Sequence, residues 1–188
     1  MVLRLVGSEM CIRDRGLEVK RLACMRQSFI ESRAPLEDNA HVMMEFEGGA
    51  VGTLWASAVN SGAMHQQKIR IVGEKASIEW WDEHPNQLKY EIQGEPPRLL
   101  DRGMGYLHND AEGVASNRIG GGHAEGYFES WANLYHRFAL AFQAANNDDQ
   151  ETLANLWYPG IDAGIEGVRL CEKCVESADQ NATWVDYK

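Results

Sequence analysis

Alternating apolar and polar residues run through the first half of the chain and predict β-strands. From Leu17 to about Leu100, apolar side chains recur at every second position or in short runs that end at turn residues. Short glycine-containing loops at residues 47–49 and 73–75 predict hairpins. Strands are expected in LEVKRLACMRQSFI, NAHVMMEF, AVGTLWASAV, KIRIV, ASIEWW and QLKYEIQ, with PRLLD as a short edge strand. We therefore expect about six antiparallel strands in sequence order.

Helical spacing replaces the strand pattern after a polar, glycine-rich loop at residues 101–125. Apolar residues three or four positions apart predict one amphipathic helix in GYFESWANLYHRFALAFQAA and a second after Tyr158-Pro159. The expected buried stripes are Phe128, Trp131, Leu134, Tyr135, Phe138, Phe142 and Ala145 in the first helix and Ile161, Ile165, Val168, Cys171 and Val175 in the second. TWVDY predicts a closing strand. Strands followed by helices indicate an α+β domain, in which an open, mostly antiparallel β-sheet has helices packed on one face.

Composition restricts the function classes without choosing one. The 188 residues fit one domain, and the formal net charge of -10 argues against a nucleic-acid footprint, which needs a basic face. No apolar run reaches the roughly 18 residues of a membrane span. Cys171 and Cys174 form a CxxC late in a helical pattern, where two core thiols are favoured over a redox motif or a zinc site. A soluble protein of the reducing cytoplasm is expected.

The loop before the first helix carries the candidate site. NRIGGGHAEGY places His123 just before a helix N-terminus, with Glu125 and Tyr127 close by, where an imidazole and backbone donors could meet a ligand. The glycines resemble a dinucleotide fingerprint, but Glu125 replaces the last glycine of GxGxxG and no βαβ unit surrounds it. Asn60 and His65 flank another loop and could reach a site at the end of the sheet. The alternative for His123, Asn60 and His65 is an exposed loop or turn residue without a role.

Five successive segments resemble the C-terminal domain of the Gfo/Idh/MocA oxidoreductases, which are named after glucose-fructose oxidoreductase and inositol dehydrogenase. The segments are DNAHVMMEFEGGAVGTLWAS, KIRIVGEKASIEWW, QLKYEI, GGHAEGYFESWANLYHRFALAF and YPGIDAGIEGVRLCEKCVES. The resemblance covers roughly residues 16–188. It implies an open sheet with helices on one face and a second subunit on the other, so a homo-oligomer is expected. Such a partner would account for Val72 and Trp81, which put apolar surface on the second side of the strands.

The resemblance also implies a Rossmann domain before this one, which binds NAD or NADP. That domain supplies a lysine from an EKP motif as the proton-transfer residue, assisted by an Asp and a His spaced DxxxH. Nothing upstream of Leu17 matches these motifs, so we expect no catalytic residue and no bound nucleotide or metal in this chain. GGHAEGYFESWANLY is similar to the family segment GHPEGYxEAFANLY, whose histidine lies near the substrate pocket. His123 is therefore expected beside the substrate; Glu125 and Tyr127 match as well, and Ala124 stands where proline is usual.

The leading hypothesis is that the parent protein is an NAD(P)-dependent oxidoreductase of a sugar, a cyclitol or a related polyol. A secondary alcohol would lose hydride to the nicotinamide. This chain would supply the wall of the substrate pocket and the oligomer interface, and would be inactive alone. An NAD-dependent glycosidase of the same fold and a noncatalytic dimerisation or sugar-binding module are the alternatives.

The N-terminal stretch LVGSEMCIRDR, Leu5 to Arg15, has a separate explanation. Its apolar residues hold neither a helical nor a strand period. The stretch resembles a translation of the adapter used in transposon-based sequencing libraries. We expect residues 1–15 to be an artefactual, disordered segment and residues 16–188 to form the substrate-binding and oligomerisation domain. The Rossmann domain would then have been lost at the end of a library fragment.

Overall fold

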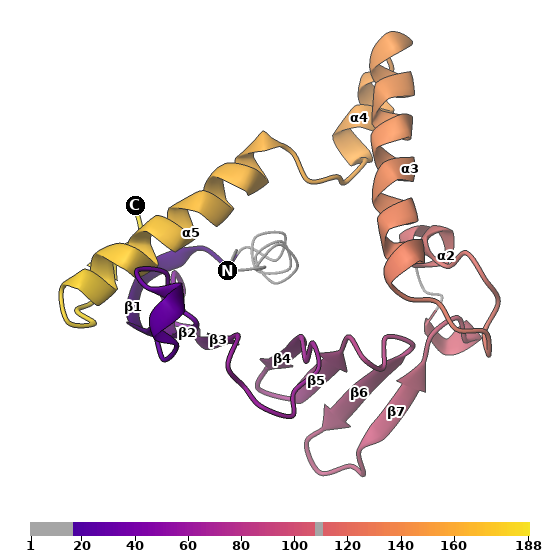
Figure 1. Cartoon of the computed structure of the whole chain (residues 1–188). Coiled ribbons are helices and arrows are strands. Elements are labelled where there is room, and N and C mark those ends of the chain that lie inside the picture. The colour runs from indigo at the N-terminus through magenta and orange to yellow at the C-terminus, as the bar shows by residue number, and fades with distance from the viewer. Residues whose placement is uncertain (1–16, 108–110) are drawn as a thin grey trace. The chain divides into compact units, whose positions relative to one another are not determined.

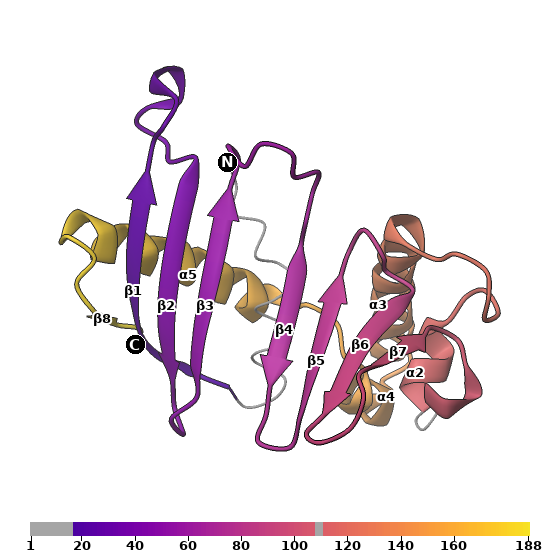
Figure 2. The same ribbon diagram turned by 90° about the horizontal axis from the view of Figure 1, so that it is seen from below.

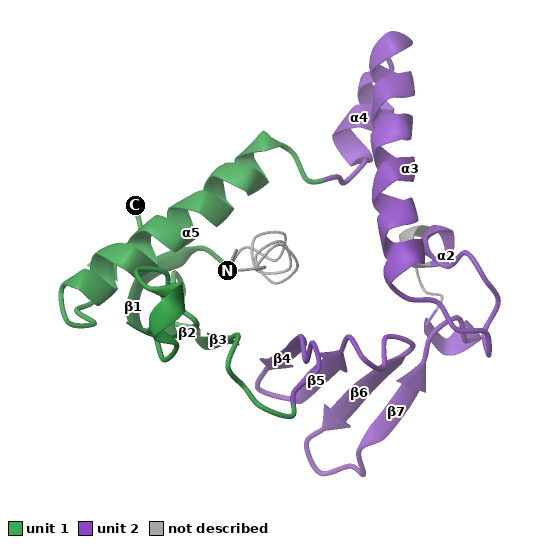
Figure 3. Ribbon diagram, in the orientation of Figure 1, with its two compact units in different colours: residues 1–62, 159–188 green, residues 63–158 purple. Residues whose placement is uncertain are grey.

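An α+β arrangement, as expected from the sequence, is seen in the computed structural model, which describes residues 17–107 and 111–188 (Figure 1). The segment 1–15, for which an artefactual origin is expected, lies outside the described residues. Hydrogen bonding joins the described strands into two antiparallel four-stranded sheets. One sheet belongs to a unit formed by the described residues up to 62 and from 159 onward, and the other to a unit of residues 63–158 (Figure 3).

The first sheet has the strand order β3-β2-β1-β8. Its strands are β1 (Val19–Gln27), β2 (Asn39–Phe46), β3 (Val51–Ser57) and β8 (Val185–Asp186). Strand β2 buries every second residue, from Ala40 to Phe46, because successive side chains of a strand point to opposite faces. The antiparallel register sets Leu22 opposite Met44, so the buried face continues onto β1. The three predicted strands of this half and the closing strand are confirmed.

Helix α5 (Ile161–Asp179) covers this sheet and lies across its strands in Figure 2. Leu170, Cys174 and Ser177 are its buried residues, and their spacing of four and three places them on one stripe. Leu170 and Cys174 join Leu22 and Cys24 of β1 in the core of the unit. Complete burial of a leucine side chain contributes about 1.5–3 kcal/mol, so this helix–sheet contact is a main source of the unit's stability.

The stripe predicted for α5 was wrong, because a different side of the helix packs on the sheet. Ile161 is 80% exposed, and Ile165 and Val168 are exposed as well. The buried stripe contains Ser177, whose Oγ accepts the backbone N–H of Cys24 and donates to Thr183 O. A prediction from apolar residues alone does not assign a serine to the buried side of a helix. A serine hydroxyl can nevertheless be buried when it is hydrogen-bonded.

The second sheet is a meander of β4 (Lys68–Val72), β5 (Ala76–Trp81), β6 (Gln87–Ile92) and β7 (Arg98–Asp101). The registers pair Ile71 with Ile78 and Ile78 with Tyr90, and they pair Trp80 with Leu88. Because directly paired residues lie on the same face of a sheet, this confirms the predicted common side. Its members are Ile69, Ile71, Ile78, Trp80, Leu88, Tyr90 and Ile92.

The strands were expected in one open sheet, and their hydrogen bonding divides them into two. In the described ladders, β3 pairs with β2 and β4 pairs with β5. The connection between β3 and β4, residues 58–67, contains positive φ at Gly62 and Gln66. This ten-residue connection is longer than the usual two to five residues of a hairpin loop, and Lys68 begins the second sheet.

Three helices follow the second sheet: α2 (Ala111–Ser116), α3 (Tyr127–Asn146) and α4 (Gln150–Asn155). The predicted helix at α3 is confirmed, but its predicted buried stripe is not. Phe128 is 82% exposed and Phe142 70% exposed, while Ala141 and Ala144 are buried. The rings contact one another along the helix, as Tyr127 does with Phe128 and Trp131. Among the helices of the described residues, none combines the length and apolarity of a membrane span.

Candidate functional site

A tight turn in the second unit presents His123. The backbone N–H of His123 donates to Gly120 O at 3.3 Å, which closes a four-residue turn. Gly122, the third residue of that turn, has φ +83°, a conformation that glycine adopts at little cost. The imidazole is exposed, and its Nδ1 also lies 3.3 Å from Gly120 O. The glycines that resemble a dinucleotide fingerprint thus form a β-turn that orients one histidine.

Glu125 lies just after this turn and is buried, with 8% of its surface exposed. Its carboxylate accepts the backbone N–H of Arg118 at 2.5 Å and that of Ile119. Arg102 Nη1 is 3.2 Å from its other oxygen. These contacts occupy the carboxylate within the protein, so the geometry makes Glu125 a support of the loop.

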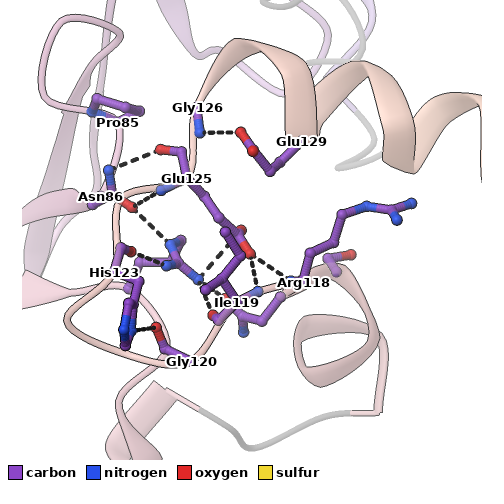
Figure 4. A network of polar contacts seen from close by, with 12 residues as sticks. Pro85, Asn86, Arg118, Ile119, Gly120, His123, Glu125, Gly126 and Glu129 are labelled. Carbon is purple, nitrogen blue, oxygen red and sulfur yellow. Dashed lines mark hydrogen bonds and ion pairs between the residues drawn. The ribbon is translucent and has the colours of Figure 1, made fainter.

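Arg102, the residue directly after β7, is the centre of a polar network. Figure 4 shows part of this network around Asn86, His123 and Glu125. Its guanidinium donates to Asn86 Oδ1 at 2.8 Å and to Asn117 Oδ1 at 2.9 Å. It also donates to two backbone carbonyl groups, Ile119 O at 3.0 Å and His123 O at 2.6 Å. The planar guanidinium can serve several acceptors at once, which a lysine ammonium cannot do with the same geometry.

Asn86 ties the loop to the β5–β6 turn. Its Oδ1 accepts the backbone N–H of Glu125 at 3.0 Å, and its Nδ2 donates to Glu125 O at 2.8 Å. This pair of bonds imitates a short piece of antiparallel ladder. Figure 4 shows Asn86 beside Glu125. The backbone N–H of Arg102 donates to Asn86 O at 2.8 Å, so Asn86 binds both Glu125 and Arg102.

The N-terminus of α3 begins directly after Glu125. Glu129 accepts the backbone N–H of Gly126 at 2.8 Å, which satisfies a donor that the helix leaves unpaired. That hydrogen bond is the main reason why the pKa of Glu129 lies below its usual value. The ring of Tyr127, the third predicted member of this loop, is 65% exposed. The structure therefore brings His123, Glu125 and Tyr127 together in one segment with two exposed rings.

His65 and Asn60, the other predicted site residues, lie elsewhere. His65 Nδ1 is 2.7 Å from Asp82 Oδ2, and its backbone N–H donates to Glu83 Oε1 at 3.0 Å. Asp82 and Glu83 belong to the β5–β6 turn that also contains Asn86, so both histidine loops are anchored to one turn. Asn60 is exposed near the end of the first unit.

Sequence reasoning missed Arg102 and Asn86. A buried carboxylate such as Glu125 needs a cationic or hydrogen-bonding partner, and this was the available signal. The chain has 18 lysines and arginines, however, and nothing in their spacing singles out Arg102. Asn86 stands in a His-Pro-Asn sequence that predicts only a turn.

The packing of the glycine-rich turn and the distribution of possible metal ligands bear on cofactor binding. A Cβ placed on Gly103 would lie 3.0 Å from the Cα and N atoms of Gly121, so Gly121 of the turn packs against backbone, whereas Gly120 and Gly122 have no close neighbour. A phosphate cradle needs that backbone exposed at the start of a helix. Within residues 17–107 and 111–188, no three His, Cys, Asp or Glu side chains gather as metal ligands.

Comparisons with known proteins place the chain among oxidoreductases. Residues 16–187 match a family model described as "Oxidoreductase family, C-terminal alpha/beta domain". YfiI, an oxidoreductase of Bacillus subtilis (strain 168), is 57% identical over 172 residues, which are 92% of this chain and 43% of that protein.

Two solved structures are also similar. An oxidoreductase from Pseudomonas syringae is 59% identical with a TM-score of 0.90, over 96% of this chain and 48% of that one. An inositol dehydrogenase homolog from Azotobacter vinelandii, complexed with NADH and myo-inositol, is 60% identical with a TM-score of 0.88. That match covers 92% of this chain and 45% of the homolog. The chain therefore spans about half the length of the relatives it matches.

Proposed function

Because the chain belongs to the Gfo/Idh/MocA oxidoreductase family, whose C-terminal domain it matches over residues 16–187, we propose a role in polyol oxidation. The chain is the substrate-side domain of an NAD(P)-dependent oxidoreductase that acts on a sugar, a cyclitol or a related polyol. The observation that carries the proposal is an exposed His123 on a turn that hydrogen bonds from its own backbone and from Arg102 hold. It is supported by a 60% identical homolog that was crystallised with NADH and myo-inositol.

His123 and Tyr127 supply the exposed polar groups of the proposed pocket wall. An imidazole and a phenol each accept and donate hydrogen bonds, which suits the hydroxyl groups of a polyol. His65, held by Asp82 and anchored to the same β5–β6 turn, is a further candidate contact. Asn60 belongs to the first unit, and its role in substrate binding stays a prediction. Glu125 acts through the loop, since its carboxylate is already occupied.

The nicotinamide cofactor accepts hydride when it is bound, and we assign its binding to the half of the relatives that this chain does not span. The middle glycine of the turn, Gly121, packs against Gly103, and we propose that the chain alone binds no nucleotide and is inactive. It contributes the pocket wall and an oligomer interface. The exposed face of the first sheet, with Met25, Met43 and Trp55, is the proposed contact between two copies.

The test is an intact oxidoreductase that carries these residues, assayed with NAD+ or NADP+ and a panel of polyols. We expect net formation of reduced cofactor, and we expect His123→Ala to raise KM by at least about tenfold, the loss of one good hydrogen bond to a charged or polar partner. Tyr135→Ala, an exposed aromatic residue of α3 beyond the loop, is the matched control. Release of sugar without net reduced cofactor would identify a glycosidase, and polyol binding without turnover would identify a binding module.

A further inference from the structure

The contact between His123 Nδ1 and Gly120 O favours one tautomer of the imidazole. A carbonyl oxygen only accepts hydrogen bonds, and Gly120 O lies 3.3 Å from Nδ1. For this hydrogen bond to form in the neutral ring, Nδ1 must carry the hydrogen. The exposed Nε2 is left as a bare acceptor, ready to receive the hydrogen of a hydroxyl group.

Arg102 holds the backbone on both sides of this turn. It donates to Ile119 O, the residue before the turn, and to His123 O, the last residue of the turn. Its donation to His123 O, at 2.6 Å, comes from Nη2, while Nη1 serves Ile119 and Asn117. Because the guanidinium is planar and rigid, these bonds fix the distance between the two ends of the turn.

Arg102 also forms an ion pair with Glu125. This charge compensation can be separated experimentally from the hydrogen bonds that hold the turn. Nη1 of Arg102 is 3.2 Å from a Glu125 oxygen, and Glu125 is buried. Any cation at this place would compensate the buried carboxylate. Only a forked donor can also bridge Asn86, Ile119 and His123.

We propose that Arg102 is a positioning residue that fixes the Gly120–His123 turn and thereby keeps His123 in the Nδ1–H tautomer, with Nε2 presented to a polyol hydroxyl. The identity of the ligand rests on the proposed function, whereas the effect of Arg102 on the ring does not. The role deepens the proposed function by assigning the direction of the hydrogen bond. The substrate donates and His123 accepts.

The experiment measures the ring nitrogens of His123 by nitrogen-15 NMR in the 188-residue chain, at alkaline pH where imidazoles are neutral. Arg102→Lys keeps a positive charge beside Glu125 but loses the fork. We expect it to retain most of the stability while the ratio of Nδ1–H to Nε2–H tautomers falls by about tenfold, the effect of one lost hydrogen bond. Arg98→Lys is the matched control, because Arg98 is an exposed arginine of β7, the strand directly before Arg102, and it pairs with Glu95.

A double variant covers the case in which Arg102→Lys does not fold. In Arg102→Gln/Glu125→Gln, no unpaired buried charge remains, and the same change in the tautomer ratio is expected. Unchanged His123 signals in a folded Arg102 variant would overturn the proposal, because Arg102 would then act only by compensating charge. Failure of the proposed function shows up separately, as an intact enzyme with unaltered Arg102 that reduces no cofactor with polyols.

Discussion

The backbone N–H of Cys24 on β1 donates to Ser177 Oγ on α5 at 2.8 Å, across 153 positions of sequence. Ser177 is fully buried, and its hydroxyl passes on a hydrogen bond to Thr183 O at 2.6 Å. Ser177→Ala would leave a buried N–H without an acceptor. We expect the free energy of unfolding to fall by about 1–3 kcal/mol, measured by denaturant titration.

Ser130→Ala is the control for that prediction. The hydroxyl of Ser130 is exposed and donates to Gly126 O within its own helix, so its loss should change the free energy of unfolding by less than about 0.5 kcal/mol. Equal effects of the two serine substitutions would show that the hydrogen bond between Cys24 and Ser177 does not stabilise the helix–sheet contact.

The contact between Gly103 and Gly121 gives a second prediction. Gly103 has φ +76°, and a Cβ on it would lie 3.0 Å from backbone atoms of Gly121. Gly94 has φ +83°, but a Cβ there meets nothing within 4 Å. Gly94→Ala should cost about 1 kcal/mol from backbone strain alone, and Gly103→Ala about 1–2 kcal/mol more. Hydrogen exchange should also speed up at His123 in the Gly103 variant only.

The hydrogen bonds of Asp38 lead to a prediction for the stability of the first unit at low pH. Its carboxylate accepts the backbone N–H groups of Phe29 at 2.9 Å and Ile30 at 3.0 Å, and the bond from Phe29 is the largest cause that lowers its pKa. A lowered pKa in the folded state gives stability that is present above the unfolded value of about 3.9. That stability is lost as pH falls through the folded pKa.

The measurement for Asp38 is the free energy of unfolding as a function of pH, from roughly pH 6 to 2. It compares the Asp38→Asn variant with the unaltered chain. The unaltered chain should lose stability below about pH 4, and Asp38→Asn should lose less over the same interval because it no longer titrates. Amide exchange at Phe29 and Ile30 locates the effect. Parallel pH profiles for the two proteins would contradict the assignment.

The thiols of Cys24 and Cys174 lie in the core of the first unit, 1% and 4% exposed. The pKa of Cys174 is raised by its hydrogen bond with the Cys24 thiol and by burial, so it stays protonated at neutral pH. In a Cys11→Ser/Cys171→Ser background, we expect an aromatic disulfide reagent to label the folded protein at least about 100-fold more slowly than the unfolded one. Equal labelling rates would show that α5 separates from β1 readily.

The exposed methionines test the proposed oligomer interface. Met43 is 52% exposed on β2, in the middle of the first sheet, where it pairs with Ala23 and Thr53. Met43→Glu should place a charge in that interface and reduce the mass measured by light scattering to that of one chain. Met64→Glu, on an exposed connection of the second unit, should leave the mass unchanged. Identical masses for both variants would exclude this face.

The predicted strands and helices agree with the structure because their signals are local. Alternation along β2 and helical spacing along α3 are properties of neighbouring residues, and the backbone periods of strand and helix impose them. The partner of each face is not a local property. For α5, two apolar stripes compete, and the choice of Leu170, Cys174 and Ser177 depends on a hydrogen bond to Cys24.

By itself, the sequence determined the α+β class, the order of the elements, the family and the place of His123 before a helix, since each follows from a periodic pattern or from a motif. Only the tertiary structure decided that Arg102 and Asn86 hold the histidine turn, and that the strands divide into two sheets. The physical reason is that a polar network is satisfied in three dimensions. The acceptors of a guanidinium are the groups that the fold brings within hydrogen-bonding distance, and the spacing of residues along the sequence does not indicate which groups these are.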